Sequence, residues 1–153
     1  MAKCAQLIGS SGSNWAKRSN TPGAITSLGF SPDGETLGTG SADGTAHVFD
    51  LATGKARGFV VKHKTPLVSV DVGRHDLLLT ASEDGVAKVL NAKDGQLIAE
   101  INCGAKIRNA HLGGSGTFLS TILSDNTVRI WECQTGKPAQ GVIRTDEGIV
   151  DAD

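Results

Sequence analysis

Short runs of β-branched and other apolar residues alternate along this chain with turns rich in glycine, proline and aspartate. In residues 24–30 apolar and polar side chains alternate, which is typical of a strand with one buried face. The Ser31-Pro32-Asp33-Gly34 sequence favours a tight turn, because Pro presets φ and Gly tolerates a positive φ. The pattern indicates an all-β chain of short antiparallel strands. Similar runs predict further strands at 35–41, 45–50, 56–61, 67–72, 77–81, 118–123 and 127–132.

One part of this pattern recurs at a constant interval. An aspartate precedes a tight turn at Asp43, Asp84 and Asp125, and each step advances by 41 residues. The glycine of the next turn keeps the same interval, at Gly54, Gly95 and Gly136. A fixed period of about 20 to 50 residues is the mark of a repeat architecture, in which each unit buries its apolar face against the next.

The charge balance argues against a dedicated nucleic-acid-binding domain. The chain has 15 basic and 16 acidic residues, for a net charge of −1, whereas such a domain usually carries a basic excess on one face. Small basic clusters at Lys17-Arg18 and between Arg57 and Lys64 leave an anionic partner open. Nucleic acid is therefore an unexpected partner, although RNA is not excluded by the sequence.

The sequence points to a reducing compartment and away from membranes. Cys4, Cys103 and Cys133 are scattered and form no disulfide framework. We find no apolar run suited to a secretory signal and none near the ~18 residues of a membrane span. We expect a cytoplasmic or nuclear protein that is not secreted.

The repeated units resemble WD repeats, the four-stranded blades of a β-propeller. The resemblance implies an all-β fold of four-stranded antiparallel blades, about three of them complete and others partial. It rests on the three turn aspartates and on these motifs: Phe30-Ser31-Pro32-Asp33-Gly34, Phe49-Asp50, Leu90-Asn91 and Trp131-Glu132.

The repeat phase divides the chain into five parts. Residues 4–9 fall one period before 45–50, and Ile149-Val150-Asp151-Ala152 aligns with Ile107-Arg108-Asn109-Ala110. The predicted division is a half-blade or leader at 1–21, blades at 22–63, 64–103 and 104–145, and the start of a further blade at 146–153.

One hallmark of WD repeats is weak here. The Gly-His that precedes the first strand of the family's blades survives only loosely, as His63. The family's hydrogen-bond tetrad of His, Ser or Thr, Asp and Trp is therefore incomplete in every blade. We expect these blades to depend more on packing than on buried polar networks.

No group of residues has the spacing of a catalytic, cofactor or metal site. Asp43, Asp84 and Asp125 lie one to a blade, so we expect each to accept hydrogen bonds within its own turn. The four histidines share no zinc-site spacing. Thr53-Gly54-Lys55 lacks the glycine frame of a phosphate loop. We expect no enzyme activity and no cofactor.

The resemblance implies a non-catalytic scaffold for protein–protein interaction, a subunit or segment of a larger complex. Partners of WD repeats usually dock on the narrow rim, which here contains Ala42, Glu83 and Ser124, with Arg108 and Thr65 nearby. One alternative is an RNA-associated subunit of a ribonucleoprotein, translation or processing complex. The other is an enzyme domain that uses the propeller channel, for which converging His, Asp or Glu residues would be needed.

Closure of the ring is a separate question. Closed propellers have about four to eight blades, and an open ring leaves apolar sheet faces and strand edges exposed. We therefore expect self-association, or completion of the propeller by another chain, and an isolated chain that is not a well-behaved monomer.

Overall fold

The computed structural model describes residues 23–139 and 143–144. In this part the chain forms three four-stranded antiparallel sheets, which we name sheet A (β1–β4), sheet B (β5–β8) and sheet C (β9–β12). The strands of sheet A are β1 (Ile25–Phe30), β2 (Thr36–Ser41), β3 (Thr45–Asp50) and β4 (Lys55–Lys62). Those of sheet B are β5 (Leu67–Val72), β6 (Leu77–Ser82), β7 (Val86–Asn91) and β8 (Leu97–Asn102). Those of sheet C are β9 (Ile107–Leu112), β10 (Phe118–Leu123), β11 (Thr127–Glu132) and β12 (Ile143–Arg144).

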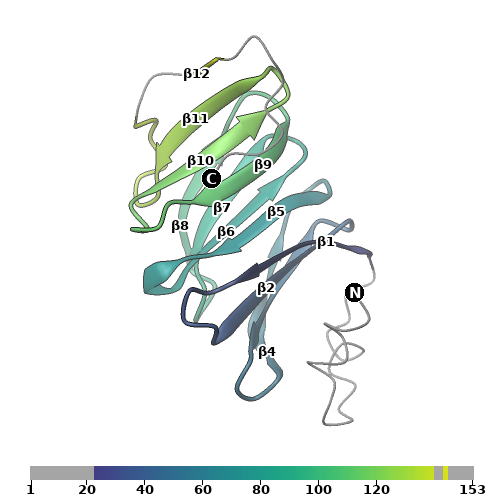
Figure 1. Ribbon diagram of the computed structural model, residues 1–153. Helices are drawn as coiled ribbons and strands as arrows, with labels where there is room; N and C mark the ends of the chain where they lie inside the picture. Colours follow the sequence, from purple (N-terminus) through teal and green to yellow (C-terminus); the bar gives the residue numbers. More distant parts are fainter. Residues whose placement is uncertain (1–22, 140–142, 145–153) are drawn as a thin grey trace.

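Each sheet is a meander in which consecutive strands are neighbours. The three sheets stack face to face in chain order, from sheet A at the bottom of Figure 1 to sheet C at the top. The first strands β1, β5 and β9 pack side by side. This is the arrangement of consecutive propeller blades, so the fold is an incomplete β-propeller, as the sequence predicts.

The strand predictions agree closely with the structure. The predicted strands at 45–50, 67–72, 118–123 and 127–132 have these bounds. A short 3-10 turn, η1 (Arg74–Asp76), stands where the second unit lacks the Ser-Pro-Asp-Gly sequence, and its His75 has a φ of 57°. The predicted half-blade at 1–21 and the predicted further blade at 146–153 lie outside the described residues.

The core lies between the sheets rather than within any one of them. Ala46 and Val48 of sheet A pack with Leu67, Val70 and Leu78 of sheet B. The sheets approach closely because Gly38 and Gly40 have no side chains; a Cβ at Gly40 would lie 2.7 Å from a Val70 methyl group. A second cluster joins sheets B and C and contains Leu79, Ala81, Val89, Leu119, Leu123 and Trp131.

Hydrogen bonds also join one first strand to the next. The hydroxyl of Thr26 donates to the Leu67 carbonyl oxygen at 2.7 Å, and the hydroxyl of Ser69 donates to the Ala110 carbonyl oxygen at 2.6 Å. In the other direction, the Leu112 N–H donates to Asp71 Oδ2 at 2.9 Å. Polar side chains on each first strand therefore bond to backbone groups of the following one.

One buried polar network adds to the apolar packing where sheet A meets sheet B. His63 Nδ1 lies 2.9 Å from the Ser82 hydroxyl, and its Nε2 lies 2.8 Å from the Thr80 hydroxyl. Ser82 also donates to Asp84 Oδ1 at 2.5 Å. Thr80 and Ser82 are fully buried. Sheet B therefore combines apolar packing with this polar network, because the register of β6 places its two buried hydroxyls next to His63.

The tetrad is nevertheless incomplete, as expected from the sequence. Leu90 occupies the tryptophan position of sheet B, opposite Leu78. In sheet C the indole N–H of Trp131 donates to the Thr121 hydroxyl at 3.0 Å. Cys103 there replaces the histidine, since its N–H bonds to Gly85 as the His63 N–H bonds to Gly44.

Candidate protein-interaction rim

Each turn aspartate uses its carboxylate within its own turn. Asp43 Oδ1 accepts bonds from the Thr45 N–H at 2.9 Å and from the Thr45 hydroxyl at 2.6 Å. Asp125 accepts from the Thr127 N–H at 3.1 Å and hydroxyl at 2.5 Å, and Asp84 accepts from the Val86 N–H at 3.1 Å. These carboxylates orient the turns that form the rim.

The same hydrogen bonds explain the acidity of two of these groups. Burial alone would raise the pKa of Asp43, but the bonds from Thr45 hold it below its usual value. Burial opposes ionisation of Asp84 as well, and the bonds from Ser82 and Val86 lower its pKa. Both side chains are therefore charged near neutral pH and are fixed in place.

The structure brings Ala42, Glu83 and Ser124 to equivalent places in the three sheets. Each is exposed and directly precedes a turn aspartate. Their N–H groups donate to the carbonyls just before the first strands: Ala42 to Ala24 at 2.8 Å, Glu83 to Pro66 at 3.0 Å and Ser124 to Lys106 at 2.8 Å. The backbone conformation is thus the same at these three positions, while the side chains differ: a methyl group, a carboxylate and a hydroxyl. We call these turns, with the connectors that meet them, the rim.

The two remaining predicted rim residues have different surroundings. Arg108 is exposed and lies at a bulge of β9, where the register with β10 shifts between Ile107 and Asn109. A bulge re-aims the extra side chain. Thr65 is half-buried, and its hydroxyl accepts a bond from the Asp84 N–H at 3.1 Å. Thr65 therefore supports the turn, while Arg108 projects from the rim.

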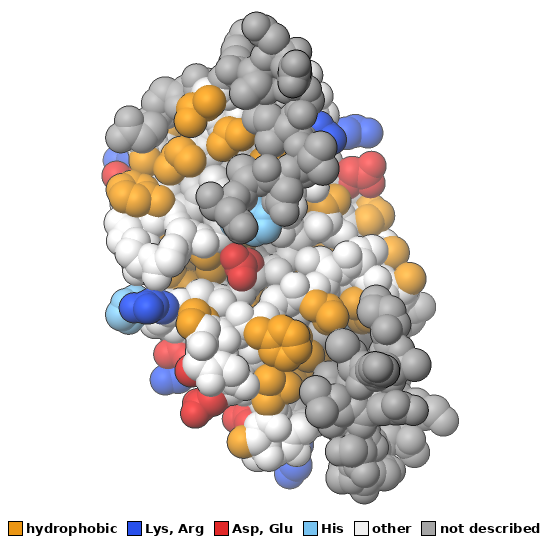
Figure 2. Space-filling view, viewed as in Figure 1, with side chains coloured by type: hydrophobic (Ala, Val, Ile, Leu, Met, Phe, Trp, Pro, Cys, Tyr) orange, Lys and Arg blue, Asp and Glu red, His pale blue; other side chains and the backbone are white. Residues whose placement is uncertain are grey.

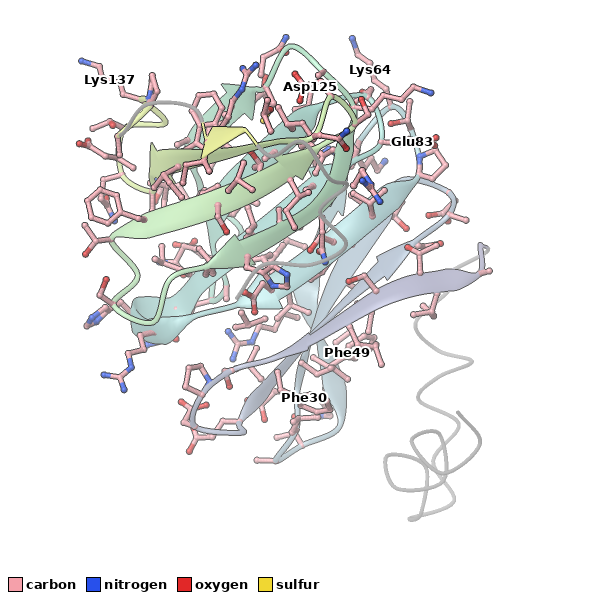
Figure 3. The ribbon with its side chains drawn as sticks, turned by 45° about the horizontal axis from the view of Figure 1, so that its top comes forward. Phe30, Phe49, Lys64, Glu83, Asp125 and Lys137 are labelled. Atoms are coloured by element: carbon pink, nitrogen blue, oxygen red, sulfur yellow. The ribbon has the colours of Figure 1, made fainter. Side chains whose placement is uncertain are left out.

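Lys64 and Lys106, which the sequence interpretation did not place on the rim, also belong to this edge. Figure 3 shows Lys64, Glu83 and Asp125 projecting from one edge of the stacked sheets, with Lys137 at the far end of sheet C. Lys106 Nζ lies 4.0 Å from Glu83 Oε1, and both side chains are exposed. Their positions just before a first strand and just before a turn aspartate could have indicated this pairing.

The long side chains of Lys88 and Arg129 anchor the connectors that lead into sheets B and C. Lys88 Nζ donates to the Lys62 carbonyl at 2.8 Å, and the Arg129 guanidinium donates to the Cys103 carbonyl at 2.8 Å. Lys88 and Arg129 lie one repeat period apart on β7 and β11. They fix the backbone of the rim, so its exposed residues are held in place before any partner binds.

The described part of the chain gives no sign of other site types. Within residues 23–139 and 143–144, no three His, Cys, Asp or Glu side chains gather as a metal ion would require. In the same residues no helix has the length and apolar character needed to cross a membrane.

Comparison with known proteins agrees with this geometry. The profile of the family "WD domain, G-beta repeat" matches residues 17–50. The chain is 28% identical over 128 residues to Protein tipD of Dictyostelium discoideum, covering 83% of this chain and 21% of that protein. It is 26% identical over 123 residues to the COMPASS component SWD3 of Saccharomyces cerevisiae, covering 73% of this chain and 39% of that protein. The chain carries WD repeats.

A solved structure supports the fold of this WD-repeat chain. BamB from Moraxella catarrhalis superimposes with a TM-score of 0.70 at 19% identity, covering 82% of this chain and 38% of that one. The likeness concerns the fold alone. The chain also spans well under half the length of the two curated relatives, 21% and 39%.

Proposed function

We propose that this WD-repeat chain is a non-catalytic scaffold that contributes blades and a docking rim to a protein complex in the cytoplasm or nucleus. The observation that carries the proposal is the repeated frame of Ala42, Glu83 and Ser124. Their backbones are fixed by equivalent hydrogen bonds, while their exposed side chains differ. A surface with a constant frame and varied chemistry can recognise one partner specifically.

The rigidity of the rim favours binding. Ordering of loops and side chains at an interface costs affinity, and here the turns are already ordered by Asp43, Asp84 and Asp125. Glu83, Lys64 and Lys106 supply both signs of charge on the exposed rim. We infer that the partner is a protein segment of mixed polarity rather than a uniformly charged polymer.

The relatives support the same proposal. SWD3 is named as a component of COMPASS, so at least one relative is named as part of an assembly. The transfer of this role to our chain is part of the proposal, because the chain spans 39% of that protein. Partner identity is not carried over.

Affinity purification with mass spectrometry tests this function. The full chain and the variant Glu83→Lys are compared with a control, Lys137→Glu, whose charge reversal lies away from the rim turns. We expect the proteins recovered with the wild type to persist with Lys137→Glu and to be depleted with Glu83→Lys. Equal recovery by all three chains would contradict the rim. Loss of all partners on RNase treatment would support the RNA-associated alternative instead.

A further inference from the structure

One turn of sheet B differs from the turns at the same place in the other two sheets. Gly34 in sheet A and Gly116 in sheet C each lie 41 residues from His75, and both glycines have a φ of 75°. His75 itself has a φ of 57°, and so does Asp76. This left-handed region suits glycine, because a Cβ there crowds the neighbouring backbone. In η1 a histidine therefore takes a strained conformation at the position where the other sheets have glycine.

The length of this turn accounts for the number of its strained residues. It has four residues, 73–76, whereas the turns at 31–35 and 113–117 have five. Each longer turn has one residue at positive φ, a glycine, and the shorter turn has two. Asp76 also has a role within the protein, because its Oδ2 pairs with Lys93 Nζ at 3.1 Å.

His75 has no comparable role in the part of the chain that the structure describes. In residues 23–139 and 143–144 neither its ring nor the Arg74 guanidinium has a hydrogen bond or an ion pair, and both residues are exposed. Strained residues persist where the surrounding structure holds them, and they gather at binding and catalytic sites. An exposed histidine at a glycine position therefore points to a role in binding another molecule.

The backbone of η1 is fixed although these two side chains are exposed. The Gly73 N–H donates to the Leu77 carbonyl at 2.8 Å, and the Leu77 N–H donates back to the Arg74 carbonyl. The Ala92 N–H donates to the Asp76 carbonyl at 2.7 Å. An ordered turn loses little conformational freedom when a partner binds, so more of the contact energy remains as affinity.

The turn lies on the edge of the sheets opposite to the rim. Consecutive strands are antiparallel, so the turn after a first strand and the turn after a second strand lie at opposite ends of a sheet. Figure 2 shows a His side chain and a Lys or Arg side chain together at the left of the molecule, where the β5–β6 turn lies in Figure 1, with Asp or Glu side chains close below them. The neighbouring turns on this edge carry Asp33, Glu35 and Asp94, which are all exposed. An anion attracted to η1 therefore meets exposed carboxylates nearby.

We propose that Arg74 and His75 bind the carboxylate of one Asp or Glu side chain in a partner protein. A guanidinium donates two parallel N–H bonds to a carboxylate, and the imidazole of the next residue supplies a further N–H donor. The nearby carboxylates repel an extended polyanion such as RNA, whereas they tolerate a single acidic residue in a segment that is otherwise uncharged. The contact lies outside the rim, so it adds a second docking point to the proposed scaffold.

Peptide binding to the full chain, followed by fluorescence anisotropy, tests this contact. The probe is a fluorescein-labelled peptide library with one central Glu and flanking positions drawn from uncharged residues, and the matched library has Gln at the centre. We expect members of the Glu library to bind, and their Gln counterparts to bind about tenfold more weakly, because charge-assisted hydrogen bonds are lost. Arg74→Ala should weaken binding of the same peptides by about tenfold. The control Lys64→Ala removes an exposed cation from the rim and should bind like the wild type.

The variant His75→Gly separates binding from folding. Glycine takes a φ of 57° without strain, so the thermal midpoint should stay the same or rise by up to about 4 °C. Peptide binding should nevertheless weaken by about threefold or more, because one donor is lost. A lower midpoint would show that the imidazole supports the fold, which would explain its position without a partner and overturn the proposal.

The binding measurements contain further outcomes that would overturn it. These are an absence of binders in the Glu library, equal binding of the two libraries, binding that Arg74→Ala or His75→Gly leaves unchanged, and equal weakening by Lys64→Ala. Labelled oligouridine that binds the wild type and is released by Arg74→Ala would assign the turn to nucleic acid instead. Glu83→Lys should leave peptide binding unchanged, so this contact and the rim fail independently.

Discussion

The hydroxyl of Ser69 donates a 2.6 Å hydrogen bond to the carbonyl oxygen of Ala110, 41 residues further along the chain. Thr26 donates a similar bond to the Leu67 carbonyl oxygen, at a different position along the first strands but also 41 residues away. Residues one repeat period apart in the sequence therefore contact each other directly where neighbouring blades meet. Each first strand contributes both an apolar face and a polar bond to the blade beside it.

Removal of this bond should weaken the interface between sheets B and C. Ser69 is buried, so Ser69→Ala leaves the Ala110 carbonyl with one partner fewer in an apolar setting. We expect the free energy of unfolding to fall by about 1–2 kcal/mol, measured by urea denaturation. Ser124→Ala alters an exposed serine and should stay within about 0.5 kcal/mol of the wild type. Equal stability of the two variants would show that the Ser69 bond contributes nothing.

The close approach of sheets A and B depends on glycine. At Gly40 an added Cβ would lie 2.7 Å from a Val70 methyl and 3.2 Å from the Leu67 Cβ. Overpacking of this kind costs about 1–3 kcal/mol, so we expect Gly40→Ala to lower the thermal midpoint. At Gly58, also within a strand of sheet A, nothing lies within 4 Å of an added Cβ. Gly58→Ala should be neutral or slightly stabilising, and a comparable loss there would refute the packing argument.

The indole of Trp131 offers a test of the partial tetrad. Its N–H donates to the Thr121 hydroxyl at 3.0 Å, and Thr121 is fully buried. Trp131→Phe keeps much of the apolar contact but removes the donor, so we expect a loss of about 1–2 kcal/mol. The double variant Trp131→Phe/Thr121→Val removes both polar partners. It should recover part of the loss in chemical denaturation, whereas a purely additive result would mean that the bond is unimportant.

The fold was largely predictable because its signals are local. Asp43 and Gly44 specify a turn within a few residues, and Gly44 has the expected positive φ of 84°. The equivalent of this glycine in sheet C is Asn126, with a φ of 63°, a residue that tolerates this region. Repetition of the same local signal then sets the order of the blades.

The site was less predictable because its contacts depend on register. His63 meets Thr80 and Ser82 only once β6 is aligned with the connector, and the loose Gly-His motif concealed this network. The ion pair of Lys106 with Glu83 likewise joins residues from different connections. The repeat period predicts where a residue lies in its blade. Which residue a long side chain contacts there depends on how the strands and connectors pack.

His63 makes the stability of the fold depend on pH. Burial, aided by the nearby Lys88, lowers its pKa from 6.5 to about 4. The unfolded chain therefore binds a proton at His63 below about pH 6.5, while the folded chain stays neutral down to about pH 4. Stability rises with pH where the unfolded state binds more protons. The contribution of neutral His63 to stability is therefore fully present above pH 6.5 and is lost progressively between pH 6.5 and 4.

Urea unfolding at pH 7 and pH 5 measures this loss. One pKa unit corresponds to about 1.4 kcal/mol, and His63 is only partly buried, so we expect a decrease of about 1–2 kcal/mol. His63→Gln cannot titrate and should be less stable at pH 7, since its amide cannot reproduce both hydroxyl contacts. Its own decrease between the two pH values should be smaller. Some pH dependence should remain, because burial also lowers the pKa of His47. An unchanged decrease in His63→Gln would assign the effect to other groups.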